Sequence, residues 1–130
     1  MASIETKISK GSTVKGLEEG NIKFGYGCMI HPYSKIITEG GSSIIFGDYN
    51  IIEEGVLIKA CPKINSKTGK EEPSSIIIGN YNHFKVGAEI INTTVQDYNI
   101  IDYSYSFHCL FFPLKIRKNY MIYYLHKKSF

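Results

Sequence analysis

Four histidines are the first residues in this sequence that could do chemistry, because an imidazole can bind zinc or serve as a general base. They are His31, His83, His108 and His126. A zinc site needs three or four ligands that converge on one point, whereas these histidines lie in different contexts. His31 precedes a proline at an expected corner, and His83 precedes a large apolar residue. We interpret both as surface residues and predict neither a metal site nor a cofactor.

Two adjacent carboxylates, Glu53 and Glu54, form the second candidate, since paired acids can carry out general acid–base catalysis. Neighbouring residues of a strand point to opposite faces, so the two cannot flank one substrate. We interpret them as a charged edge that blocks wrong strand pairing, or as a contact with a partner protein. Together with His31 they are the possible partner contacts, and no catalytic residue is predicted.

Charge and cysteine content argue against several functional classes. Residues 1–102 carry ten basic and twelve acidic residues, whereas residues 103–130 carry five basic and no acidic ones. A nucleic-acid-binding protein would need a basic face interleaved with aromatics on its folded body, which this sequence lacks. The three cysteines share no motif spacing and are interpreted as reduced thiols of a cytoplasmic protein. No apolar run approaches the ~18 residues of a membrane span, and no signal peptide is expected.

Internal repetition indicates how these residues are positioned. Four segments resemble one another: FGYGCM from Phe24, FGDYNI from Phe46, IGNYNH from Ile78 and VQDYNI from Val95. A large apolar residue opens each segment, and another follows after six and after twelve residues. The inward-pointing residues predicted from this spacing are Phe24, Ile30, Ile36, Phe46, Ile52, Ile58, Ile78, Phe84, Ile90, Val95 and Ile101. Insertions fall only between groups of three hexads, as expected for loops at one corner of a coiled scaffold.

The six-residue period predicts an all-β fold, a single-stranded parallel β-helix of about four coils. Three short strands, each turned sharply into the next, form one triangular coil with its large apolar side chains inside. One coil cannot bury these side chains alone. Coils stacked about 4.7–4.9 Å apart place isoleucine over isoleucine in continuous ladders.

Asparagines and glycines recur at fixed places in this repeat. Asn50, Asn82 and Asn99 each stand just before a corner. Asparagine tolerates the left-handed backbone that such corners need, and stacked asparagines can share hydrogen bonds. The glycines at the second repeat position occur singly, one coil apart, and are interpreted as turn formers rather than a phosphate-binding loop. They are Gly25, Gly47 and Gly79.

Several stretches of the sequence resemble the dynactin subunit 6 family. They are Ile30-His31-Pro32 followed by Ile36-Ile37, FGDYNIIEEGVLI at 46–58, a polar corner loop at 60–75, and IIIGNYNHFKVG at 76–87. The resemblance runs from about Ile8 to Asp102. It implies a left-handed β-helix, which composition alone does not reveal, because parallel crossovers in almost all other folds are right-handed.

The resemblance also implies a function. Members of this family are non-enzymatic subunits of the pointed-end complex of dynactin, which supports dynein-driven transport along microtubules by scaffolding and by recruiting cargo or adaptors. The implied partners are dynactin subunit 5, dynactin subunit 4 and the pointed-end actin-related protein, in the cytoplasm and at the cytoskeleton. Neither nucleic acid nor direct insertion into a membrane is expected.

Hexapeptide repeats also occur in enzymes, so an enzymatic alternative stays open at this stage. The γ-class carbonic anhydrases bind zinc through three histidines between neighbouring subunits. In their register the ligand positions fall near Ile58, Val86 and Ile91, which are all apolar. Hexapeptide-repeat acyltransferases need a general-base histidine beside a cleft between coils, and His31 and His83 are the candidates within the repeat region.

The resemblance ends after Asp102, so we expect residues 1–102 to form the β-helix and residues 103–130 to form a distinct aromatic and basic tail. The tail has nine aromatic residues and no glycine. Phe107 continues the spacing, but Pro113 stands six residues later, and proline cannot donate to a ladder. The tail is interpreted either as a divergent, poor cap on the last coil or as a non-native ending from an alternative transcript or a translated intron.

Overall fold

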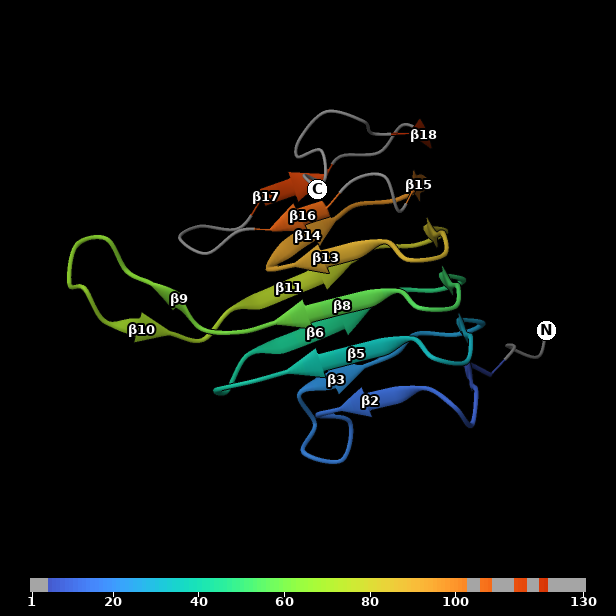
Figure 1. The fold of residues 1–130 in the computed structure, drawn as a ribbon, viewed down its shortest axis with the longest axis horizontal. Coiled ribbons are helices and arrows are strands. Elements are labelled where there is room, and N and C mark those ends of the chain that lie inside the picture. Colours follow the sequence, from blue (N-terminus) through green and yellow to red (C-terminus); the bar gives the residue numbers. More distant parts are fainter. Residues whose placement is uncertain (1–4, 103–105, 109–113, 117–119, 122–130) are drawn as a thin grey trace.

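Three parallel sheets form the sides of a prism, and the chain visits them in strict rotation (Figure 1). The computed structural model describes residues 5–102 and three short segments beyond them, 106–108, 114–116 and 120–121. The predicted left-handed parallel β-helix is confirmed. No helix in the described part of the chain is long and apolar enough to cross a membrane.

Short strands build each sheet. The first sheet contains β1 (Lys7–Ile8), β4 (Met29–Ile30), β7 (Ile51–Ile52), β12 (His83–Phe84), β15 (Asn99–Ile101) and β18 (Tyr120–Met121). The second contains β2 (Thr13–Lys15), β5 (Lys35–Thr38), β8 (Leu57–Ala60), β13 (Glu89–Ile91) and β16 (Ser106–His108). The third contains β3 (Ile22–Lys23), β6 (Ser43–Phe46), β11 (Ser75–Ile78), β14 (Thr93–Val95) and β17 (Leu114–Ile116). The described strands thus make five successive coils, and β18 begins a further one, so the predicted number of about four is too low.

The predicted inward residues line the inside of the prism. Ten of the eleven are buried, and the eleventh, Phe24, is partly buried and packs against them. The Phe24 ring stacks on the Phe46 ring of the next coil, with 4.8 Å between the ring centroids. Each fully buried isoleucine or phenylalanine contributes roughly 1.5–3 kcal/mol of transfer free energy.

The third sheet carries a second inward column that the six-residue count missed. In β6 both Ile44 and Phe46 are buried, and in β11 both Ile76 and Ile78 are buried. Alternate residues of a strand face the same side, so a strand of four residues places two side chains inside. The six-residue count assigned one inward residue to each strand and therefore underestimated the core.

Stacked asparagines join successive coils at the corner between the third and first sheets. Asn50 Oδ1 accepts a hydrogen bond from the Asn82 backbone N–H at 2.9 Å, and Asn82 Oδ1 accepts one from the Asn99 N–H at 2.9 Å. All three residues are buried. The predicted hydrogen bonds between stacked asparagines are confirmed, and they satisfy backbone donors that the turn would otherwise leave unpaired.

The left-handed backbone at this corner lies one residue before each asparagine, which corrects the prediction. Tyr49, Tyr81 and Tyr98 have φ angles of 57°, 59° and 60°. The asparagine side chain points inward and bonds to the next coil, so the tyrosine before it adopts the left-handed conformation that the corner requires. A non-glycine residue in this region costs about 1–2 kcal/mol, which the stacked hydrogen bonds offset.

The glycines at the second repeat position serve close packing rather than turning. A Cβ atom on Gly25 would lie 2.6 Å from the carbonyl oxygen of Gly47, and one on Gly47 would lie 2.7 Å from that of Gly79. None of the three has a positive φ angle. Glycine is required here because the backbones of adjacent coils approach too closely for any side chain, so the interpretation as turn formers was wrong.

The predicted corner loop at 60–75 is a hairpin that projects from the prism (Figure 1). Its strands, β9 (Lys63–Ile64) and β10 (Glu71–Glu72), pair antiparallel. Asn65 holds the tip: its Oδ1 accepts the N–H of Lys67 at 2.8 Å, and its Nδ2 donates to Glu72 Oε1 at 2.7 Å. The insertion therefore has a defined structure of its own.

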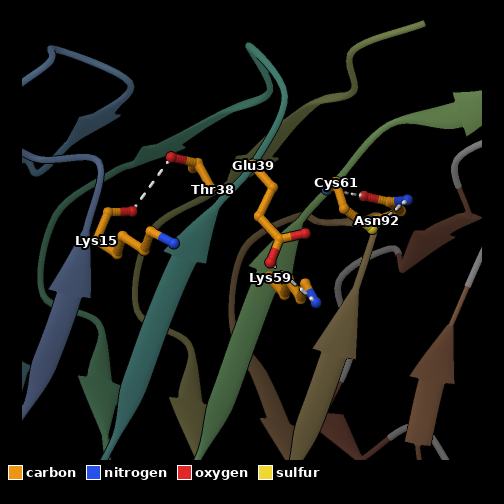
Figure 2. A network of polar contacts seen from close by, with 6 residues as sticks. All are labelled: Lys15, Thr38, Glu39, Lys59, Cys61 and Asn92. Atoms are coloured by element: carbon orange, nitrogen blue, oxygen red, sulfur yellow. Dashed lines mark hydrogen bonds and ion pairs between the residues drawn. The ribbon is translucent and has the colours of Figure 1, made fainter. Parts of the chain in front are cut away.

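Polar contacts between coils surround the corner from which this hairpin leaves (Figure 2). Thr38 Oγ1 donates to the carbonyl oxygen of Lys15 in the coil before, at 3.2 Å. The Cys61 N–H donates to Asn92 Oδ1 in the coil after, at 2.9 Å. These side-chain hydrogen bonds link successive coils at the corner where insertions interrupt the backbone hydrogen bonds between strands.

The sheets continue past Asp102, where the β-helix was predicted to end. Phe107 pairs with Ile90, as its spacing predicts. Ile116, rather than Pro113, takes the place beside Val95 because additional residues separate β16 from β17. The interpretation of the tail as a poor cap or a non-native ending concerns residues that lie largely outside the described ones.

Burial in the prism predicts a large difference between two alanine substitutions. Ile52 is fully buried between coils, so Ile52→Ala should lower the free energy of unfolding by about 2–5 kcal/mol. Lys67 is exposed at the hairpin tip, and Lys67→Ala should change it by less than about 0.5 kcal/mol. Urea unfolding followed by circular dichroism measures both, and equal shifts would contradict the assignment of inside and outside.

Candidate functional site

The possible partner contacts lie together at the corner between the first and second sheets, which we call the charged corner. His31 follows β4, and Glu53 and Glu54 follow β7 in the next coil. The His31 N–H donates to the carbonyl oxygen of Ile52 at 2.9 Å, and the Glu53 N–H donates to that of Phe84 at 3.0 Å. These matching bonds place His31 and Glu53 in one column, although twenty-two residues separate them in the sequence.

Glu53 is held by the following coil. Its Oε2 lies 2.5 Å from Nε2 of His83, and its Oε1 accepts the Val86 N–H at 3.1 Å. The His83 hydrogen bond lowers the pKa of the Glu53 carboxyl below its ordinary value of 4.5. Burial, the second-largest influence, raises this pKa, and the Val86 bond and the charges of His83 and Lys85 lower it further. The carboxyl is therefore ionised near neutral pH, which suits an ion pair and not a general acid.

Glu54 differs from its neighbour. It is exposed, and within the described part of the chain its carboxylate makes no hydrogen bond or ion pair. Both glutamates lie after the end of β7, and Glu54 is in the turn itself, so the strand argument for opposite faces does not apply to them. The two acids have different surroundings, and of the two only Glu54 has a carboxylate that is free of contacts among the described residues.

The contact between Glu53 and His83 was missed in the sequence, although the repeat contains the signal for it. His83 pairs with Ile51 in the preceding coil, and Glu53 follows two residues after Ile51, just beyond the end of β7. Aligning the hexads therefore places Glu53 and His83 in neighbouring coils near the same corner. His83 was predicted to lie on the outer surface, and it is only half-buried there.

The structure gives the metal chemistry considered above no support within the described residues. They contain no group of three or more histidine, cysteine, aspartate or glutamate side chains that could hold an ion. Of the positions that align with the zinc ligands of γ-class carbonic anhydrases, Ile58 is buried, Val86 is exposed and Ile91 is half-buried. The side chains of His108 and His126 lie outside the described residues.

The chain is similar in sequence to three curated proteins. These are dynactin subunit 6 of Danio rerio, 33% identical over 100 residues, of Xenopus tropicalis, 33% over 99, and of Nematostella vectensis, 36% over 100. Each match covers 74% of this chain and 51%, 49% and 53% of the respective relative. The chain thus spans about half the length of the curated relatives it matches. No protein-family model matches it.

The lowered pKa of Glu53 predicts a pH-dependent contribution to stability. A carboxyl whose folded pKa lies below its unfolded pKa stabilises the protein at neutral pH, and this contribution is lost as the pH falls below about 4.5 and through the folded pKa. Glu53→Gln should therefore be less stable than the parent at pH 7, by no more than about 1 kcal/mol because the pair is partly exposed, and equally stable at about pH 2.

Glu54→Gln is the matched control, since it removes a neighbouring carboxylate that pairs with none of the described residues. Urea unfolding across this pH range measures both variants. The role given to the His83 contact would be contradicted if Glu53→Gln lowered the free energy of unfolding equally at every pH. It would also be contradicted if Glu54→Gln changed that free energy with the same pH dependence as Glu53→Gln.

Proposed function

Because the chain belongs to the dynactin subunit 6 family over the three quarters of its length that match, we propose that it is a structural, non-enzymatic subunit of the pointed-end complex of dynactin. In this role it scaffolds the complex and recruits cargo or adaptors for dynein-driven transport along microtubules, in the cytoplasm and at the cytoskeleton. The sequence identity with three curated relatives is the observation that carries the proposal.

The geometry supports a scaffolding role. A solenoid presents columns of side chains at regular spacing along rigid faces, and such faces suit extended protein contacts. The charged corner is one such column, with His31 and Glu53 in adjacent coils and the free carboxylate of Glu54 beside them. We propose these three residues as contacts to the partners that the family implies: dynactin subunit 5, dynactin subunit 4 and the pointed-end actin-related protein.

A matched pair of double variants tests these contacts. Glu53→Gln with Glu54→Gln removes two adjacent acids from the charged corner, and Glu71→Gln with Glu72→Gln removes two from the hairpin. Each tagged full chain is expressed in its own cells, isolated, and its companions are identified by mass spectrometry. The parent and the hairpin variant should recover dynactin subunits, and the charged-corner variant should recover at least about threefold less.

Recovery of the parent chain alone, as a homotrimer, would contradict the proposed function. Recovery of dynactin subunits by all three chains at equal levels would leave the function standing and remove the charged corner from the interface.

The enzymatic alternative has a direct test. The purified full chain should contain no stoichiometric zinc by elemental analysis, because its aligned ligand positions are apolar, and it should show neither carbonic anhydrase nor acetyltransferase activity. About one zinc ion per chain, retained through dialysis against a weak chelator, would overturn the non-enzymatic proposal in favour of a γ-carbonic-anhydrase-like protein.

A further inference from the structure

Three tyrosines stack at the corner between the third and first sheets, and we call them the tyrosine ladder. The rings of Tyr49 and Tyr81 have centroids 5.3 Å apart, and those of Tyr81 and Tyr98 have centroids 5.1 Å apart. The ring planes differ by only 16° and 4°. The repeat therefore places one aromatic ring per coil at this corner, with nearly parallel planes and centroid separations within the range that aromatic pairs favour.

The ladder stops one coil earlier, at Gly27. Gly27 occupies the same repeat position as the tyrosines and has the same left-handed backbone, with φ at 69°. A Cβ atom there would overlap the ring of Tyr49, so that ring lies directly against the glycine. Where a further ring would continue the ladder, the surface is hollowed to about 300 Å³.

The lining of this hollow has the chemistry of an aromatic-binding site. Tyr49 forms one side, and Met29 and Ile51, on the outer face of the first sheet, add apolar surface. Glu5 and Lys7 from the first coil complete the lining with opposite charges. Aromatic rings stack on tyrosine, contact methionine sulfur favourably and attract a lysine ammonium over their face.

We propose that this hollow binds an aromatic side chain presented by a partner protein, so that the partner's ring extends the tyrosine ladder by one position. Two features favour an uncharged aromatic group over other occupants. The opposite charges of Glu5 and Lys7 leave the lining without a net charge, which disfavours a charged side chain. The chain itself fills the equivalent place in the following coils with a tyrosine ring. That a partner protein supplies the ring rests on the proposed function, whereas the capacity of the hollow to bind an aromatic ring does not.

N-acetyltyrosinamide is the probe for this site, and N-acetylleucinamide is its aliphatic control. The full chain is labelled at its methionine methyl groups and titrated with each compound by NMR. The tyrosine compound should shift the Met29 methyl resonance in a saturable way, and the leucine compound should bind at least about tenfold more weakly. Equal binding of the two compounds, or no saturable shift at Met29, would overturn the proposal.

Variants locate the binding. Met29→Lys places a charge in the hollow, and Ile77→Lys places one on the third sheet at a residue of similar exposure, 52% against 47%. In Gly27→Tyr the new side chain, at a φ angle that tyrosine adopts at three other corners, would overlap the present position of the Tyr49 ring and so displace that ring from the wall of the hollow. Affinity for N-acetyltyrosinamide should fall at least about tenfold in Met29→Lys and Gly27→Tyr, as read from the tyrosine probe's own line broadening, and stay unchanged in Ile77→Lys.

Each variant is first checked for a parental circular dichroism spectrum and melting curve. Undiminished binding in a folded Gly27→Tyr variant would show that the probe sits elsewhere and would overturn the assignment. Because the probe is a small molecule, its failure to bind leaves the role in dynactin intact. Failure to recover dynactin subunits would in turn leave the measured aromatic site standing.

Discussion

Backbone hydrogen bonds between successive coils are the interaction on which the rest of this structure depends. They hold Ile30 beside Ile52 and Ile52 beside Phe84, so a six-residue spacing in the sequence becomes a column of side chains in space. One coil has no core of its own, and each apolar side chain is desolvated only when coils lie on both sides of it. The stability of any coil is therefore inseparable from that of its neighbours.

The same register decides what the corners contain. Because coils repeat at the spacing of hydrogen-bonded strands, a residue at a given corner always meets its counterpart in the next coil. At one corner this closeness excludes side chains altogether, as at Gly47 against Gly79, while the adjoining positions accept flat, stackable groups such as the Tyr81 ring. Stacked asparagines use the same geometry to satisfy backbone donors inside the prism.

The outer face of the first sheet connects the two surfaces considered as binding sites. Met29 and Ile51, which line the hollow beside the tyrosine ladder, pair in register with each other, and Ile51 pairs with His83. His83 in turn holds Glu53 at the charged corner. An apolar hollow and the Glu53–His83 contact thus lie at opposite edges of one narrow face, and protein interfaces commonly combine apolar and polar groups in this way.

The sequence by itself determined the fold class and one inward column of each sheet, because the period of a β-helix appears directly in the spacing of large apolar residues. Ile52, Phe84 and Ile101 are buried for this reason. It did not determine the second inward column at Ile44 and Ile76, the position of the left-handed residue at the corners, or the reason for the glycines. Those depend on how closely two backbones approach. Aligned hexads bring Glu53 and His83 into neighbouring coils, but only the folded chain decided that their side chains meet and that a hollow forms beside Gly27, because no spacing rule supplies side-chain distances.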